Sequence, residues 1–273
     1  MSSANSDSVA FIGGGNMATA IIGGLLRQGL SATRIVVVEP WAQARGKLQV
    51  QFGIEAHESA NDALGAAGLV LWAVKPQTFR DAAAQAAPFT RNALHLSVAA
   101  GILSGSIAAW LGTERIVRSM PNTPALVGKG MTALFARSAV SDADKQRIEQ
   151  VIATTGEYLW VGAEDDLDAV TALSGSGPAY VFFFLEAMRE AGVEMGLDAD
   201  QALKLALETF IGACELARTS NDPPEVLRQR VTSKGGTTYA AITSMEQDRL
   251  KPMFIKALHA ARTRARELGK EFT

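Results

Sequence analysis

The stretch Val9-Ala10-Phe11-Ile12-Gly13-Gly14-Gly15-Asn16-Met17-Ala18 (residues 9–18) decides the fold of the first half of the chain. Its four apolar residues predict a buried strand, and the glycines after them predict a tight turn into a helix. Gly13 permits the turn, Gly15 lets backbone N–H groups approach a pyrophosphate, and Ala18 lets helix and strand pack closely. Unpaired N–H groups and the helix dipole favour negative charge at such a helix N-terminus. Because the motif follows a strand and opens a helix, it indicates a dinucleotide-binding turn.

The chain up to about residue 162 alternates short apolar runs with helical stretches. This alternation is typical of a parallel sheet covered by helices, so we expect an α/β fold with a doubly wound, Rossmann-type sheet over residues 1–162. Ser141, followed by early acids, opens a further helix, and we expect Gly156 to end it. The expected strands are residues 9–12, 34–38, 69–74, 93–98, 115–119, 131–135 and 158–161.

Residues 163–273 contain almost no strand-like segments, and we expect an all-α dimerisation domain there. The segment Tyr180-Val181-Phe182-Phe183-Phe184-Leu185 is apolar around its whole circumference, so its helix has to be buried on every side. Two arrangements would bury it: a partner subunit in a homodimer, which we favour, or the core of a compact monomer. The expected helices are residues 168–173, 179–195, 199–219, 224–231, 237–247 and 250–269.

The net charge of −2 gives no broad basic field, which argues against nucleic acid or an anionic membrane as the main partner. The one cysteine, Cys214, cannot form an internal disulfide, so we expect a reducing, cytoplasmic location. Residues 1–7 lack the basic and apolar regions of a signal peptide. Serines, glycines and His95 interrupt the uncharged run 92–113, which predicts a strand, a turn and a short helix rather than a membrane span.

The second strand ends at Glu39. An acid at this place accepts hydrogen bonds from the adenosine ribose hydroxyls of NAD(H) and repels the 2′-phosphate of NADP(H). Arg45 in the next helix would offset that repulsion, and Trp41 would stack on adenine. The alternative is that Glu39 only caps the helix that follows it. The residues thus lean toward NADH and leave the choice between NADH and NADPH open.

Two clusters of small residues stand out in the helical half. One is Leu173-Ser174-Gly175-Ser176-Gly177-Pro178-Ala179-Tyr180, and the other is Thr232-Ser233-Lys234-Gly235-Gly236-Thr237-Thr238. Both offer hydroxyls and bare N–H groups ahead of a helix, which is the chemistry of a carboxylate or phosphate cradle. The alternative for each cluster is an ordinary turn between helices.

Six stretches together carry a family resemblance. They are Phe11-Ile12-Gly13-Gly14-Gly15-Asn16-Met17-Ala18, Ala73-Val74-Lys75-Pro76, Ala99-Ala100-Gly101, Met120-Pro121-Asn122-Thr123-Pro124-Ala125, Ser174-Gly175-Ser176-Gly177-Pro178-Ala179-Tyr180 and residues 233–238. In this order, over nearly the whole chain from Val9 to about Leu268, they resemble pyrroline-5-carboxylate reductase. Ordered agreement over this length is far more specific than any single glycine motif.

The resemblance implies reduction of 1-pyrroline-5-carboxylate to L-proline with NADPH or NADH, the last step of proline biosynthesis. It also implies a Rossmann domain followed by a helical domain that interlocks in a homodimer, with five dimers assembling into a decamer. The implied partner is a small cyclic imino acid.

The resemblance further implies roles for particular residues. Thr238 would reach the ring nitrogen as the catalytic residue, and the loop before it would hold the substrate carboxylate, in its own site or in that of the neighbouring subunit. The implied substrate-binding residues are Ser176, Ser233, Gly235, Gly236 and Thr237. The implied cofactor-binding residues are Gly13, Gly15, Asn16, Met17, Ala18, Glu39, Ala73, Val74, Lys75, Pro76, Ala100, Gly101, Asn122 and Thr123.

Two positions depart from the family pattern. Lys234 stands where many members have proline, so the substrate loop is expected to be less rigid and more basic. Glu39 stands where members that favour NADPH often have a small hydroxyl residue. The second departure puts the usual choice of cofactor in doubt without affecting the reaction.

Reduction of a C=N bond needs little acid catalysis, because the product is a strongly basic amine. A positioned hydroxyl can donate a hydrogen bond to the ring nitrogen and relay a proton from water. His57, His95 and His259 share no motif, and we expect structural or surface roles for them. No grouping of His, Cys, Asp or Glu has metal-ligand spacing, so we expect no metal.

Two other classes of protein are the alternatives. A β-hydroxyacid dehydrogenase-like reductase would need an acid–base lysine in the second half, with an asparagine four residues further on. Lys204 has leucine and alanine neighbours, and no asparagine stands four residues after it. A non-catalytic nucleotide-binding regulator would not need the hydroxyl- and glycine-rich loop at 233–238.

Overall fold

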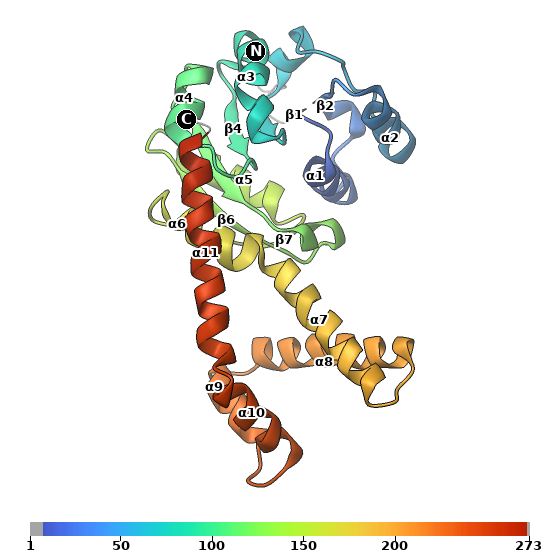
Figure 1. Ribbon diagram of the computed structural model, residues 1–273. Helices are drawn as coiled ribbons and strands as arrows, with labels where there is room; N and C mark the ends of the chain where they lie inside the picture. The colour runs from blue at the N-terminus through green and yellow to red at the C-terminus, as the bar shows by residue number, and fades with distance from the viewer. Residues whose placement is uncertain (1–7, 272–273) are drawn as a thin grey trace. The chain divides into compact units, whose positions relative to one another are not determined.

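The computed structural model describes residues 8–271, and a seven-stranded sheet is built from residues 9–160 (Figure 1). The strand order across the sheet is β2-β1-β3-β4-β5-β6-β7. The strands are β1 (Val9–Ile12), β2 (Ile35–Val38), β3 (Leu69–Trp72), β4 (Leu94–Ser97), β5 (Ile116–Met120), β6 (Gly130–Ala136) and β7 (Gly156–Trp160). All seven expected strands are present, and the Rossmann-like fold class is confirmed.

The expectation of a parallel sheet is wrong for the last two strands, which run opposite to the other five. The strands from β2 to β5 run parallel, whereas β6 is antiparallel to β5 and β7 is parallel to β6. Only a short link containing the 3₁₀ helix η3 (Thr123–Val127) joins β5 to β6. A parallel pairing needs a crossover of a dozen or more residues, usually through a helix, so this link allows only an antiparallel partner.

Helices cover both faces of the sheet. Successive residues of a strand point to opposite faces, and Ala10 and Phe11 of β1 accordingly belong to different core clusters. Phe11 packs in the cluster that includes α1 (Asn16–Arg27), α2 (Ala42–Phe52) and α5 (Asp142–Ile152). Ala10 packs in the cluster that includes α3 (Pro76–Thr90) and α4 (Ser104–Leu111). Short 3₁₀ turns, η1 (Ala32–Arg34) and η2 (Asp62–Ala66), precede β2 and β3.

The start of α5 is as expected, but its end is not. The Ser141 hydroxyl accepts a hydrogen bond from the Asp144 N–H at 3.1 Å, and the Asp144 carboxylate accepts one from the Ser141 N–H at 3.2 Å. This reciprocal pair is a capping box. The helix ends at Ile152, and Gly156 opens β7 instead of closing α5. Gly156 is required there because its φ is 142° and a Cβ would collide with the backbone of Gly130.

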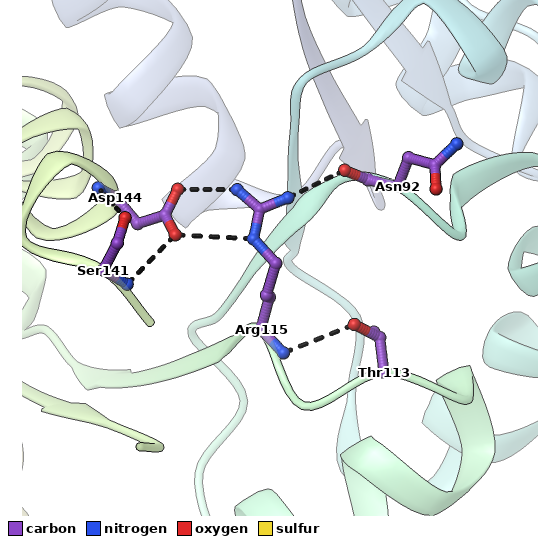
Figure 2. Close-up of polar contacts among 5 residues, drawn as sticks. All are labelled: Asn92, Thr113, Arg115, Ser141 and Asp144. Atoms are coloured by element: carbon purple, nitrogen blue, oxygen red, sulfur yellow. Dashed lines mark hydrogen bonds and ion pairs between the residues drawn. The ribbon is translucent and has the colours of Figure 1, made fainter. Parts of the chain in front are cut away.

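Arg115, just before β5, ties together three segments at the edge where the parallel strands begin (Figure 2). Its guanidinium donates to Asp144 Oδ1 at 2.6 Å and to the backbone oxygen of Asn92 at 2.9 Å. Burial would raise the pKa of Asp144, but the hydrogen bonds from Arg115 and Ser141 hold it below its usual value. The capping box of α5 is thus part of a charged network that closes this edge.

Packing divides the chain into two compact units. The first unit contains the sheet and consists of the chain up to Ser176 together with the chain from Ala261 onward. The second unit is residues 177–260. The first unit also contains the short helix α6 (Asp166–Val170) and the π-helical turn η4 (Thr171–Gly175). The predicted division into residues 1–162 and 163–273 follows composition rather than packing, and it stays a prediction.

The second unit is helical, as expected. Its helices are α7 (Gly177–Glu194), α8 (Ala199–Thr219), α9 (Pro224–Arg230), α10 (Thr237–Gln247) and the first half of α11 (Leu250–Glu271). Helices α7 and α8 approach closely because Gly192 faces Ala202: a Cβ on Gly192 would lie 2.6 Å from that of Ala202. Phe182 and Phe183 of α7 are nevertheless 58% and 66% exposed. The chain alone therefore does not bury its most apolar helix, which disagrees with the compact-monomer alternative.

The uncharged run 92–113 folds as expected into strand β4, a turn and helix α4. Within residues 8–271, every helix is too short or too polar to span a membrane.

Candidate active site

The sheet gathers most of the predicted cofactor residues at one edge. The registers of β2, β1, β3, β4 and β5 bring the carboxyl ends of these parallel strands to the same side. The chain reverses its direction across the sheet at β1, and in open α/β sheets ligands bind beside such a switch point. The predicted residues that follow these strand ends are Gly13, Gly15, Glu39, Ala73, Val74, Lys75, Pro76, Ala100, Gly101, Asn122 and Thr123.

The glycine turn is forced by the packing of β1 against β3. Gly13 has a φ of 98°, and a Cβ there would lie 2.6 Å from the backbone oxygen of Ala73. Its N–H donates to the oxygen of Val38 at 2.8 Å, so the turn is bonded to β2 as well. A side chain at Gly13 would have to separate the strand ends, which explains why this position is glycine.

The N-terminus of α1 is open to a ligand. Gly15 is the N-cap of the helix and has no side chain to accept hydrogen bonds from the first turn. A Cβ on Gly15 would meet nothing within 4 Å, and Asn16 after it is exposed. Ala18 is fully buried, and Met17 is half-buried beside the core. Bare amides at a helix N-terminus fit a pyrophosphate, so these residues fit the dinucleotide that the sequence predicts.

Glu39 is buried against this turn. One carboxylate oxygen accepts a hydrogen bond from the Gly14 N–H at 2.8 Å, and the other accepts one from the Trp41 N–H at 2.9 Å. The second bond ties the Glu39 side chain to the residue just before α2, whose first turn receives no side-chain cap. The choice between the two sequence interpretations of Glu39 stays open. Arg45 donates to the backbone oxygens of Glu39 and Pro40, at 2.9 Å and 2.7 Å, rather than to the carboxylate.

Lys75 and Pro76 begin a second helix at the same edge. Lys75 is the N-cap of α3 with extended backbone angles, as expected for a residue before proline, and its side chain is exposed. Pro76 occupies the first turn, where its missing N–H costs nothing. The segment 73–76 thus leads from the glycine turn into another helix N-terminus.

The Ala99–Gly101 turn is supported from the far end of the chain. Gly101 has a φ of 76°, and a Cβ there would lie 3.2 Å from Cβ of Leu268 in α11. The last turns of α11 therefore pack on the loop that follows β4. Sequence analysis missed this contact, because the two residues are far apart in the chain and neither belongs to a shared pattern.

Asn122 and Thr123 lie where β5 ends. The Asn122 side chain accepts a hydrogen bond from the Met131 N–H at 2.9 Å and donates to Ser174. Thr123 is exposed and opens η3, which packs against α1. The residues 122–123 are thereby brought next to the helix of the glycine turn.

Sequence analysis also missed a part-buried ion pair between β5 and the segment before α6. Arg118 of β5 donates to Glu164 at 2.6 Å, and Glu164 accepts from both the N–H and the hydroxyl of Ser104. Burial would raise the pKa of Glu164, but the Ser104 hydrogen bonds and the Arg118 charge hold it below its usual value. Glu164 thus caps α4, the helix that follows the Ala99–Gly101 turn. The only signal in the sequence was an arginine inside an apolar strand.

The predicted substrate loop lies in the second unit. Gly235 has a φ of 77°, which favours glycine, and a Cβ on Gly236 would lie 2.7 Å from the Ser233 hydroxyl, which would have to move. Gly236 is the N-cap of α10, whose first turn contains no acidic residue. Thr237 is exposed and Thr238 is half-buried at this N-terminus. The loop therefore presents hydroxyls and bare amides together, as a carboxylate cradle would.

Ser176, the remaining predicted residue, follows the π-helical turn η4 in the first unit. Its N–H donates to the oxygen of Thr171 at 2.8 Å, which is the wide hydrogen bond of a π-helix. Among residues 8–271, no three His, Cys, Asp or Glu side chains are placed to hold a metal ion. The expectation that no metal is needed stays a prediction.

A topological switch point with a glycine turn, in a chain that also has a helical unit, is typical of nicotinamide-nucleotide-dependent oxidoreductases of the Rossmann type. Two family models match: NADP oxidoreductase coenzyme F420-dependent over residues 8–101, and Pyrroline-5-carboxylate reductase dimerisation over residues 164–268. The pyrroline-5-carboxylate reductase of Pseudomonas aeruginosa is 43% identical over 265 residues, 96% of this chain and 97% of that protein.

Solved structures agree with the sequence comparison. The pyrroline-5-carboxylate reductase of Coxiella burnetii has a TM-score of 0.86 at 37% identity, covering 96% of this chain and 98% of that one. The Plasmodium falciparum enzyme, solved with NADP bound, has a TM-score of 0.86 at 28% identity over 96% of this chain and 98% of that one. The chain belongs to the pyrroline-5-carboxylate reductase family. Its dimerisation-domain match and the exposed phenylalanines of α7 show that it forms a homo-oligomer.

Proposed function

We propose that the chain reduces 1-pyrroline-5-carboxylate to L-proline with NADPH or NADH, the last step of proline biosynthesis. The observation that carries this proposal is the N-terminus of α10. There, Gly235 and Gly236 bring hydroxyls and bare amides together in a chain that is homologous to reductases of this name over its full length. A nucleotide-binding regulator would have no need for a second anion cradle of this kind.

The first unit supplies the cofactor residues in this proposal. The amides that open α1, after Gly15, hold the pyrophosphate, while the loops after β3, β4 and β5 line the rest of the dinucleotide. The shortest side chains lie where the backbone has to approach the ligand most closely. When bound, the reduced nicotinamide supplies the hydride for the C=N carbon.

The substrate residues have distinct tasks. The amides and hydroxyls of residues 233–237 hold the carboxylate, and Ser176 contributes a further hydroxyl. The Thr238 hydroxyl donates a hydrogen bond to the ring nitrogen, where electron density gathers as the C=N carbon is reduced. Nitrogen then takes up a proton that the hydroxyl relays from water, so that no histidine or carboxylic acid is required.

We propose NADH as the preferred donor, and Glu39 as the residue that selects it. The Glu39 carboxylate is buried at the end of β2 and both of its oxygens are fixed by backbone N–H groups. A 2′-phosphate brought to this place would meet a negative charge that cannot turn away. Arg45 is committed to backbone oxygens and to Glu58, so it does not neutralise that charge directly.

The oligomer in this proposal is a homodimer through the helical unit, with five dimers forming a decamer. The exposed apolar side chains of α7 and α8 support a dimer, because a face of this size is costly to leave in water. A cytoplasmic location agrees with a single, exposed cysteine.

The proposed reaction is tested by mixing the purified protein with NADH or NADPH and 1-pyrroline-5-carboxylate. We expect cofactor oxidation that depends on this substrate, with equimolar formation of L-proline. Turnover of a hydroxy acid or keto acid, with none of the cyclic imine, would contradict the proposal.

A further inference from the structure

The side chain of Asn122 links the end of β5 to a segment that lies 52 residues further along the chain. Its Oδ1 accepts a hydrogen bond from the Met131 N–H at 2.9 Å. Its Nδ2 lies 3.3 Å from the backbone oxygen of Ser174 and 3.2 Å from the Ser174 hydroxyl, and donates to both. All three residues belong to the first unit.

These bonds use most of what the amide can offer. An asparagine side chain has two N–H donors and one oxygen with two lone pairs. Both donors of Asn122 are directed at Ser174, and one lone pair is directed at Met131. The group is therefore poorly suited to bind a cofactor hydroxyl or amide, which is the role that the family resemblance implies for it.

The segment that Asn122 holds is the π-helical turn η4. Turns of this kind are rare and occur frequently at functional sites. Met120, two residues before Asn122, lies against Gly175, where a Cβ would collide with the Met120 side chain. The end of β5 thus holds both Ser174 and Gly175, directly before Ser176.

We propose that Asn122 is a positioning residue that holds residues 174–176 in the π-helical turn and thereby places Ser176 for the substrate. Asn122 acts through its hydrogen bonds to other residues of the chain and does not contact the cofactor. This inference rests on the proposed function, because Ser176 is a substrate-binding residue only if the chain binds the cyclic imino acid.

The test compares Asn122→Ala and Asn122→Asp with the native protein. Both variants lose the donors to Ser174, and the aspartate keeps an acceptor for Met131. We expect the KM for 1-pyrroline-5-carboxylate to rise about tenfold, as the loss of two ordinary hydrogen bonds would give. The Kd of NADH, titrated without substrate, should stay within about twofold. A raised Kd for NADH with an unchanged substrate KM would show that Asn122 contacts the cofactor and would overturn the inference.

A second variant and a control variant complete the test. Ser174→Ala removes only the hydroxyl acceptor, so it should shift the substrate KM in the same direction by a smaller factor, even if Asn122→Ala folds poorly. Asn92→Asp is the matched control, because this asparagine lies at the opposite edge of the sheet and only its backbone oxygen is bonded to Arg115 (Figure 2). It should change neither constant.

Hydrogen exchange separates a failure of the inference from a failure of the proposed function. Loss of the hydrogen bonds from Asn122 should speed exchange of the amides in residues 171–176, whether or not the chain turns over the cyclic imine. Unchanged exchange in Asn122→Ala would overturn the inference. No turnover by the native protein would instead contradict the proposed function alone.

Discussion

The carboxylate of Glu39 accepts a hydrogen bond from the backbone N–H of Gly14 at 2.8 Å. The acid at the end of β2 is therefore bonded to the glycine turn that it follows by 25 residues. Glu39 thus places an acid at the edge of the sheet where the predicted cofactor residues gather, and it fixes the backbone of the glycine turn there. A substitution at this position should accordingly change cofactor selectivity and stability together.

For selectivity, we expect Glu39→Ser to raise the ratio of kcat/KM for NADPH to that for NADH by about tenfold or more, since the buried negative charge is removed. Glu39→Gln keeps the shape and tests the charge alone, so it should move the ratio in the same direction. An unchanged ratio in both variants would leave Glu39 with a structural role only, through its bonds to the N–H groups of Gly14 and Trp41. Thermal unfolding should show a loss of about 1–3 kcal/mol for Glu39→Ser, because the buried N–H of Gly14 and the part-buried N–H of Trp41 lose their acceptor.

Two glycines of the same turn should respond in opposite ways. Gly13→Ala places a Cβ 2.6 Å from the Ala73 oxygen at a φ of 98°, so it should destabilise the fold by about 2 kcal/mol or more. Gly15→Ala meets no protein atom within 4 Å and should leave the free energy of unfolding nearly unchanged, while weakening NADH binding. Denaturant titrations and NADH titrations of both variants check this. Equal stability of the two proteins would refute the packing argument.

The proposed role of Thr238 is tested by Thr238→Ala. We expect kcat to fall about 10–100-fold, the worth of one hydrogen bond in the transition state, with the Kd of NADH unchanged. Thr238→Ser keeps a hydroxyl and should recover most of the activity. Native-like kcat in the alanine variant would remove Thr238 from the mechanism.

His95 should make stability depend on pH. It is a buried residue of β4, where Trp72 Nε1 donates to its Nδ1 at 3.0 Å and the oxygen of Thr90, the last residue of α3, lies 3.2 Å from its Nε2. Burial lowers the pKa of His95 to about 4 from 6.5. Between these two pH values His95 is protonated in the unfolded chain and neutral in the folded protein. The free energy of unfolding therefore falls as the pH falls from about 6.5 to about 4. The loss is at most about 3 kcal/mol.

Urea unfolding at several pH values measures this slope, and His95→Gln is the comparison. The variant should be less stable at neutral pH, since its contact with Trp72 changes, but its stability should depend less on pH within that window. The same slope in both proteins would show that other groups cause the acid sensitivity.

The sequence alone predicted the elements well because their signals are local. Strand β3 is a continuous apolar run, and α8 was predicted to both of its ends by helical periodicity. The direction of β6 was not predictable in this way, because an apolar run looks the same in a parallel and in an antiparallel strand. Only the length of the β5–β6 link contained that information.

The contacts that shape the site were beyond local reasoning. Arg118 pairs with Glu164 across 46 residues, and Asn122 pairs with Ser174 across 52. Within its own segment, neither residue signals a distant partner. An acid before a helix, such as Glu164, predicts a helix cap, and an asparagine before a threonine, such as Asn122, predicts a turn. Family resemblance located the site residues but assigned roles by motif, and the hydrogen bonds of Asn122 now suggest a different role.

The packing of Leu268 on Gly101 makes one loop of the sheet depend on a distant part of the chain. All seven strands of the sheet are complete by Trp160, yet the loop after β4 lacks its support until the final turns of α11 have been made. A chain that has folded all of its strands but lacks the last turns of α11 would therefore keep its sheet and leave this loop unsupported.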